Sequence, residues 1–228
     1  MLFWAVRLNA PRIGAHVREE EDIIVKRIVC ALLTSGVILL AQAGKTASKP
    51  GAKTEVALFD GQSLAGWHQE GEAKWRVAGG AIVADASGDG WLRSDKAYTN
   101  FVLSIEYRNS PKGNSGIFLR ATKETKPAEQ CNPVDAYEFQ INNEDPKYAT
   151  GSVEDVIQRL VTINPASNQW HKVEITVRGN NIAATLDGQK VLDGSDAKLK
   201  SGHIGLQHHK DMKIEFRGIR IRDLGANR

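Results

Sequence analysis

The sequence predicts an all-β protein built as a two-sheet antiparallel sandwich or jelly roll. Apolar and polar residues alternate repeatedly from residue 55 onward, which is the period of half-buried strands. Turn signals such as Gly-Asn-Asn and Asp-Gly-Gln separate these runs. About a dozen strands in roughly 170 residues, without a stacking repeat, are typical of a sandwich or jelly roll.

The individual strands are read from their alternation. Residues 75–85 predict a hairpin around Ala-Gly-Gly, and residues 170–193 predict three strands joined by two tight turns. Residues 212–224 alternate until Gly218, where the phase slips, so we expect a bulge there. In the run 151–161 the apolar residues have helical spacing, but a loop followed by a strand fits equally well.

The composition of the 228 residues is that of a globular protein, with 41% hydrophobic and 25% charged residues. The formal net charge of +3 is spread along the chain, and no cluster of lysine and arginine is interleaved with aromatic residues. We therefore expect no nucleic-acid partner. Cys30 lies in a segment that we expect to be removed, which leaves Cys131 as an incidental loop thiol without a disulfide partner.

Residues 25–43 have the three parts of a signal peptide. Lys26 and Arg27 provide the charged start, an apolar run follows over 28–40, and Ala-Gln-Ala at 41–43 provides a cleavage site. The apolar run is shorter than the roughly 20 residues that a spanning helix needs. We therefore expect cleavage after Ala43, export, and no membrane span in the mature protein.

The segments on either side of this signal differ in character. Residues 1–24 contain Arg-Glu-Glu-Glu-Asp, which is acidic where a signal should be basic, so we interpret them as an extension from a start codon assigned too early. Residues 44–54 are small, polar and basic, and predict a flexible linker. Residues 55–228 then form one folded domain.

Three strands suggest a polar binding face. Residues 101–108 place Phe101, Leu103, Ile105 and Tyr107 on one face, and residues 116–120 and 137–141 alternate in the same way. If these strands pair, their second faces share the side chains of Glu106, Arg108, Phe118, Arg120, Glu138 and Gln140. Carboxylate, guanidinium and amide groups beside an aromatic ring suit a sugar. The alternative is an ordinary solvated sheet face.

Glycines and histidines add two further hints. Gly113 and Gly116 flank Asn114 and Ser115, which indicates either a close approach of the backbone to a neighbour or a simple loop. In the run 202–209 the apolar residues alternate inward, which places Gln207 and His209 on the opposite face. His209 is either a candidate general base or a solvated surface histidine.

The stretches LFDGQSLAGW, GNSGIFLR, AYEFQI, TGSV, NQWHKVEI, GHIGLQHH and MKIEFRGIRIRDL follow one another in this order. Together they resemble the 3-keto-disaccharide hydrolase domain family over residues 55–224. The resemblance implies a concanavalin A-like jelly roll in a bacterial protein that is periplasmic or secreted. It further implies a substrate that is a glycoside whose C3 hydroxyl has been oxidised to a ketone, and hence a functional link to a sugar 3-oxidoreductase.

The resemblance also implies roles for particular residues. A ketone at C3 makes the C2 proton acidic, so a base can remove it, the C1 leaving group departs, and water adds to the product. Glu138 and His209 match family positions and are the expected base and acid, and Arg120 would stabilise the enolate charge. Substrate binding would fall to Asn114, Gln140, Glu106, Phe118, Arg108 and Gln207. The resemblance leaves open whether the protein needs a divalent metal as a cofactor, and the sequence assigns no residue as a metal ligand.

Two other functions remain open at this level. The same fold serves non-catalytic carbohydrate-binding, lectin-like modules, and a surface protein with a merely solvated face is a third interpretation. The chain also departs from the family pattern around the expected site. Asn142 and Asn143 replace a common acidic residue, Val-Glu-Asp-Val follows Thr-Gly-Ser where an aromatic residue is common, and Lys210 follows His209.

Overall fold

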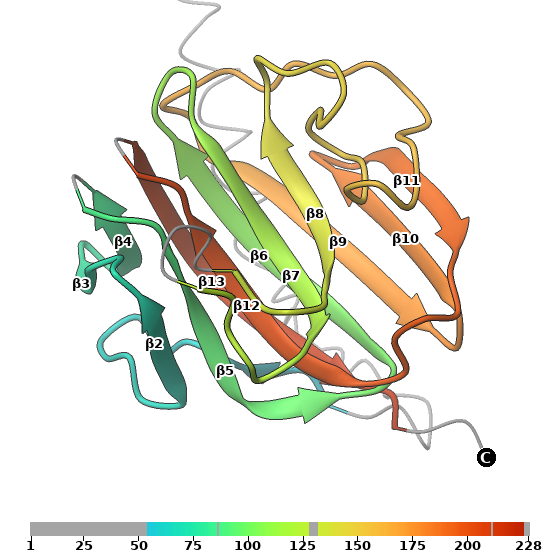
Figure 1. Ribbon diagram of the computed structural model, residues 1–228, viewed down its shortest axis with the longest axis horizontal. Coiled ribbons are helices and arrows are strands. Elements are labelled where there is room, and N and C mark those ends of the chain that lie inside the picture. Colours follow the sequence, from blue (N-terminus) through green and yellow to red (C-terminus); the bar gives the residue numbers. More distant parts are fainter. Residues whose placement is uncertain (1–53, 86, 128–131, 211, 226–228) are drawn as a thin grey trace, which may run out of the picture. The chain divides into compact units, whose positions relative to one another are not determined.

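The computed structural model describes residues 54–85, 87–127, 132–210 and 212–225, which form two antiparallel β-sheets (Figure 1). The predicted all-β, two-sheet fold is confirmed. Helices are absent from this part of the chain, so it offers none that is long and apolar enough to cross a membrane. The predictions for the signal peptide, the extension before it, almost all of the linker, Cys30 and Cys131 lie outside the described residues.

Within the described residues, one sheet has eight strands. They are β1 (Val56–Ala57), β3 (Trp75–Ala78), β4 (Ala81–Asp85), β6 (Phe101–Asn109), β9 (His171–Arg178), β10 (Asn181–Leu186), β11 (Gln189–Ser195) and β13 (Lys213–Asp223). Their order is β11-β10-β9-β6-β13-β4-β3, and β1 pairs with β13. We call this the eight-stranded sheet.

The other sheet carries five strands in the described residues. They are β2 (Trp67–Gly71), β5 (Gly90–Tyr98), β7 (Asn114–Ala121), β8 (Tyr137–Asn142) and β12 (Gly202–His208), in the order β2-β5-β12-β7-β8. Consecutive strands such as β6 and β7 lie in different sheets, so the chain crosses between the layers as a jelly roll does.

The core lies between the sheets and is built from the predicted inward faces. The four inward-facing side chains of β6 are at most 1% exposed, and they join one buried cluster with Ile117 of β7 and Phe139 of β8. Burying large aliphatic and aromatic side chains is the main favourable term in folding, at about 25 cal/mol for each Å² of apolar surface. The alternating pattern therefore identified the residues that hold the two layers together.

The predicted turns and the bulge are present as well. Gly79 and Gly80 both have positive φ, at 58° and 76°, in the two-residue turn between β3 and β4. Gly218 has φ of 60° where the pairing of β13 with β6 shifts register between Arg217 and Arg220. Residues 151–161 contain no helix, and Val153 instead bridges to Phe139 and to Ile157.

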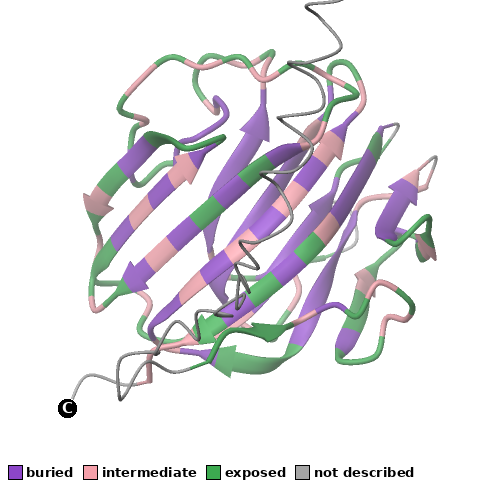
Figure 2. Ribbon diagram, turned by 180° about the vertical axis from the view of Figure 1, so that it is seen from behind, coloured by how far each residue is buried: buried purple, intermediate pink, exposed green. Residues whose placement is uncertain are grey.

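The outer faces of the two sheets differ in burial. Along β6 and β9 of the eight-stranded sheet, buried residues alternate with exposed or half-buried ones (Figure 2). By contrast, every residue of β8 is buried, and so is every residue of β7 after Asn114. A sheet face stays this buried only when other parts of the chain cover it. The outer face of the five-stranded sheet is therefore where a pocket can form.

The predicted pairing of the three polar strands is wrong. β7 and β8 do pair, with Phe118 opposite Glu138. β6 pairs with β9 and β13 in the eight-stranded sheet instead. Alternation shows which residues share a face of one strand, but it does not show to which sheet that strand belongs.

Candidate functional site

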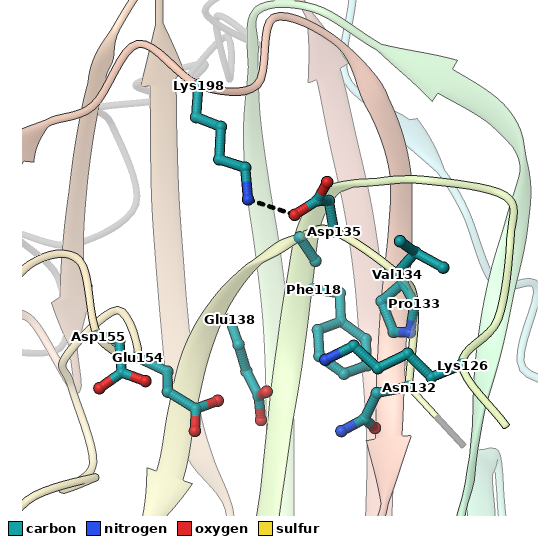
Figure 3. A pocket seen from close by; sticks show the side chains of 11 residues that line it. Phe118, Lys126, Asn132, Pro133, Val134, Asp135, Glu138, Glu154, Asp155 and Lys198 are labelled. Atoms are coloured by element: carbon teal, nitrogen blue, oxygen red, sulfur yellow. Dashed lines mark hydrogen bonds and ion pairs between the residues drawn. The ribbon is translucent and has the colours of Figure 1, made fainter. Parts of the chain in front are cut away.

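A groove runs over the outer face of the five-stranded sheet. It consists of a pocket of about 320 Å³ and a smaller one of about 130 Å³, and Asn132, Glu138 and Glu154 line both. Figure 3 shows the larger pocket, where the carboxyl groups of Glu138 and Glu154 lie beside each other. The two acidic side chains thus stand where the two halves of the groove meet.

Six of the nine residues that the sequence singled out line this groove. Phe118 lines the larger pocket, Glu138 lines both, and the smaller pocket is lined by Asn114, Gln140, Gln207 and His209. They come from β7, β8 and β12, or from the turn that follows β12, because these strands are neighbours in the sheet. The alternation rule therefore placed these side chains on the correct face.

Glu138 is the most unusual of these side chains. It is only 6% exposed, and its Oε1 atom has no hydrogen-bond partner among the described residues. Burial raises the pKa of Glu138 well above its usual value, and the neighbouring Glu154 raises it further, while Gln207 and Lys126 oppose the shift. A buried carboxyl group with a raised pKa is a candidate for proton transfer.

Gly116 on β7 explains how Glu138 fits. A Cβ atom at this position would lie 2.6 Å from Cγ and 2.8 Å from Cδ of Glu138, which is closer than carbon atoms approach. The carboxyl side chain therefore lies across the backbone of Gly116. Of the two interpretations of this glycine, close approach is the one that the structure bears out.

Glu154 is a groove residue that sequence reasoning missed. Residues 149–154 run along β8, with Gln140 N–H donating to Ser152 O and Glu154 N–H donating to Glu138 O. This pairing buries Val153 and directs Glu154 to the groove beside Glu138. A strand-like alternation in Ser-Val-Glu could have indicated it, but the helical spacing of the longer run 151–161 hid this signal.

The unpaired polar atoms of the groove are all acceptors. Oε1 of Glu138, of Gln140 and of Gln207 is buried without a hydrogen-bond partner among the described residues. The amide orientations are fixed by donation, because Nε2 of Gln140 donates to Glu154 Oε2 at 3.1 Å and Nε2 of Gln207 donates to Asn132 Oδ1 at 3.2 Å. Buried polar groups are rarely left unpaired, so these three oxygens stand out among the groove side chains.

Phe118 forms a wall of the groove rather than an open platform. Its ring is 2% exposed and stands at 90° to the ring of Trp91, with centroids 5.7 Å apart. Gly205 of β12 makes room for both rings, because a Cβ atom there would lie 2.7 Å from Trp91 and 2.9 Å from Phe118. The expected stacking of a sugar face on Phe118 is thus limited to its edge.

Arg120 does not reach the groove, which corrects its predicted role. Its Nε and Nη2 atoms donate to Thr99 O at 2.9 and 2.5 Å, and Nη1 donates to Leu199 O at 2.7 Å. Arg120 has φ of 52° and lies at a β-bulge, where β7 has one more residue than the paired stretch of β12. This bulge breaks the alternation, so Arg120 does not share the face of Phe118 and instead ties together two loop carbonyls.

Glu106 and Arg108 also lie away from the groove, because β6 belongs to the other sheet. Glu106 accepts from Arg217 Nε at 2.7 Å, and Arg108 donates to Glu215 at 2.6 Å. Both arginines lie over the ring of Trp170, with Arg108 at 4.7 Å and Arg217 at 4.0 Å from its centroid. The structure therefore does not bring Glu106 and Arg108 together with the groove residues, and both form ion pairs on the eight-stranded sheet.

His209 lines the smaller pocket with Glu138 and remains about half exposed. Its Nδ1 atom lies 3.7 Å from Asp89 Oδ1. The neighbouring His208 is buried instead, and its two ring nitrogens contact Gly88 O and Met212 O. Of these two histidines, His209 is the one placed to exchange a proton with a ligand in the groove.

Glu138 and Glu154 lie together in the groove, and no third histidine, cysteine, aspartate or glutamate of the described part joins them at the spacing of a metal site. The chemistry below is derived from the side chains of the groove.

Sequence comparison decides the family. The profile of the 3-keto-alpha-glucoside-1,2-lyase-like domain matches residues 54–222. The chain belongs to this family. A curated relative from Bacteroides thetaiotaomicron, named 3-keto-disaccharide hydrolase, is 25% identical in an alignment that covers 74% of this chain and 78% of that protein.

Solved structures agree on the fold of this family member. A candidate glycosyl hydrolase from Parabacteroides distasonis has a TM-score of 0.66 at 19% identity and covers 75% of this chain and 94% of its own. A carbohydrate-binding module from Bacillus subtilis has a TM-score of 0.53 at 15% identity and covers 70% of this chain and 97% of its own. At these identities the likeness shows the fold, and the lectin-like sandwich that the sequence predicted is confirmed.

Proposed function

We propose that this protein cleaves 3-keto-glycosides, including 3-keto-disaccharides, by elimination followed by hydration. The family and the hydrolase name of its relative support a carbohydrate-active role. The observation that carries the finer proposal is Glu138, a buried carboxyl group with an unpaired oxygen where the two halves of the groove meet. Such a group is suited to remove a carbon-bound proton that an adjacent ketone has made acidic.

The acceptors around Glu138 support a sugar as the ligand. A sugar carries several hydroxyl donors on one small ring, and Oε1 of Gln140 and of Gln207 would each accept one of them. Asn114 and Asn132 line the same smaller pocket and supply further amide groups. An unpaired buried acceptor costs about 1–3 kcal/mol, so a hydroxyl that pairs with it gains both affinity and orientation.

The reaction follows from the groups that line the groove. Glu138 in its anionic form takes the C2 proton, and the electron pair of the C–H bond forms the enolate of the C3 ketone. The C1–O bond then breaks, the leaving oxygen takes a proton from His209, and the sugar is left with a C1–C2 double bond. Water adds its hydroxyl to C1 and its proton to C2, so the net change is hydrolysis.

The negative charge of the enolate oxygen needs a cation beside it. Lys126 would stabilise this charge, which is the role that the sequence had suggested for Arg120. Lys126 lines the larger pocket, and its ammonium group points to the side where Glu138 lies (Figure 3). Its charge already acts on Glu138, whose pKa it lowers against the effect of burial. A cation fixed beside developing negative charge is among the strongest contributions to catalysis.

The direct test offers the protein two sugars. A chromogenic 3-keto-glucoside and the same glucoside without the ketone are incubated with the wild type and with Glu138→Gln, each with and without EDTA. We expect cleavage of the keto sugar alone, a loss of about 10²–10⁴-fold in the variant, and no effect of EDTA. Binding of either sugar without cleavage would replace the proposal with a non-catalytic carbohydrate-binding module.

Two further proposals follow from this chemistry and from the sequence. The substrate must come from an oxidation of a sugar hydroxyl at C3, so a sugar 3-oxidoreductase acts before this protein. Residues 25–43 have the pattern of a signal peptide, so we propose that the protein acts in the periplasm or outside the cell. The mature N-terminus, measured by mass spectrometry on the exported protein, tests the second proposal.

A further inference from the structure

We propose that Glu138 and Glu154 form a carboxyl pair that holds one proton between them, with Glu154 acting as a positioning residue for Glu138. The pair is a property of the free protein, and only its catalytic meaning rests on the proposed function. Neither the alternation pattern nor the family resemblance singled out Glu154. The inference therefore comes from the geometry of this chain.

The backbone fixes the two residues next to each other. Glu154 N–H donates to Glu138 O at 3.0 Å, which places residue 154 beside β8 like the residue of an added strand. Both side chains line both pockets, and the neighbouring Glu154 raises the pKa of Glu138. Their carboxyl groups lie beside each other in Figure 3.

Each carboxyl group is held from its other side. Nε2 of Gln140 donates to Glu154 Oε2 at 3.1 Å, which orients that carboxylate. Glu138 lies across Gly116, where any larger residue would displace it. Separate contacts thus hold each carboxyl group in the groove, and neither position depends on a proton shared between them.

The charges around the pair do not cancel two anions, of which Glu138 is buried and Glu154 half-buried. The titratable groups that share a pocket with Glu138, besides Glu154, are Lys126, Asp135, Asp155, Lys198, His209 and Tyr148. Lys198 is engaged by Asp135, so its charge is balanced locally. Lys126 remains as a nearby cation for two carboxylates, and like charges at hydrogen-bond distance in a buried site ionise one after the other.

A shared proton has a direct use in the proposed reaction. The electrostatic repulsion from Glu154 makes the anionic form of Glu138 a stronger base than an ordinary carboxylate. The retained proton lies between the two carboxyl groups, and Oε1 of Glu138 has no hydrogen-bond partner among the described residues. Glu154 would thereby set the pH at which Glu138 becomes active, without touching the reacting carbon.

The test titrates Glu138 in the free protein and needs no substrate. Uniform ¹³C labelling of glutamate gives a carboxyl signal for Glu138, assigned by its loss in Glu138→Gln, and its chemical shift is followed from pH 3 to 9. Glu154→Gln keeps an oxygen for Gln140 and removes the neighbouring charge. We expect the midpoint of Glu138 to fall by about one pH unit or more in this variant.

The matched control is Asp155→Asn, which removes one negative charge from the same pocket at an exposed position. Its φ of 54° is tolerated by asparagine, so the backbone should not change. An unchanged midpoint in Glu154→Gln, or an equal fall in Asp155→Asn, would overturn the pair. If Glu154→Gln fails to fold, the wild type still decides, because a shared proton requires a two-step titration of the Glu138 signal and a single step refutes it.

This outcome is separate from the fate of the proposed function. A coupled titration of Glu138 and Glu154 without cleavage of the keto sugar would support the carboxyl pair and refute the proposed enzymatic function. Cleavage of the keto sugar by a protein in which Glu138 titrates independently of Glu154 would support the proposed function and refute the carboxyl pair.

Discussion

The side chain of Glu138 lies across Gly116, the residue that precedes Ile117 on the neighbouring strand, and a Cβ atom there would lie 2.6 Å from Cγ of Glu138. One missing methyl group thus decides whether a carboxyl group can occupy the middle of the groove. Gly116, the third residue of β7, is therefore part of the site, and its replacement is the first test.

Gly116→Ala should displace Glu138 from the groove. We expect a loss of about 1–3 kcal/mol in the free energy of unfolding, because the added methyl group overpacks a buried site. The measurement is urea unfolding of the single variants and of the double variant with Glu138→Ala. In the double variant the clash partner is gone, so the cost of the alanine should largely disappear. Equal costs in both backgrounds would show that Gly116 serves the backbone and not Glu138.

Glu138 should destabilise the fold at neutral pH. Its pKa is raised in the folded protein by burial, so above the ordinary pKa of glutamate the unfolded chain releases this proton while the folded protein retains it. The protonated carboxyl group of Glu138 therefore contributes to the free energy of unfolding at low pH. This contribution is lost as the pH rises toward the pKa of Glu138 in the folded protein, at up to about 1.4 kcal/mol per pH unit. Glu138→Gln should raise Tm at pH 7 and have almost no effect near pH 4. A variant with the same Tm difference at both values would contradict the raised pKa.

Lys126 should matter for turnover and Lys198 should not. Both line the larger pocket, but Lys198 is paired with Asp135, whereas Lys126 acts on Glu138. Lys126→Met should lower kcat on the keto sugar by about 100-fold or more, because the enolate loses its cation. Lys198→Met is the matched control and should retain kcat. Similar losses in the two variants would point to the overall charge of the pocket instead.

Arg120 should matter for stability alone. Arg120 is 1% exposed and its guanidinium donates to Thr99 O and Leu199 O, so Arg120→Met leaves two half-buried carbonyl oxygens without this partner. We expect a loss of about 2–3 kcal/mol in the free energy of unfolding and an unchanged kcat for the protein that remains folded. Urea unfolding and assays well below Tm measure the two quantities. A drop in kcat at full folding would return Arg120 to the reaction.

The sequence was sufficient to predict the strands and the sheet face on which most of the groove residues lie. Alternation in β6 identified four core residues, and the phase slip at Gly218 identified a bulge, because side chains of a strand alternate strictly between two faces. The same rule placed Glu138 and Gln140 together in the groove, since β7, β8 and β12 are neighbours.

The remaining site residues depend on tertiary contacts that alternation does not report. Glu106 was assigned to the wrong sheet because β6 and β7 are consecutive in the chain but lie in different layers. Arg120 sits at a bulge that shifts its side chain to another side, and no local residue pattern marks that bulge. Glu154 comes to Glu138 through backbone hydrogen bonds between an irregular segment and β8.

Abstraction of the C2 proton by Glu138 is the central claim, and deuterium at C2 tests it most directly. The rate of cleavage of a 3-keto-glucoside is compared with that of the same sugar carrying deuterium at C2, under conditions where substrate is limiting. The account predicts a primary isotope effect on kcat/KM and, in D₂O, one deuterium at C2 of the hydrated product. Equal rates for the two sugars, with the C2 hydrogen retained in the product, would contradict it.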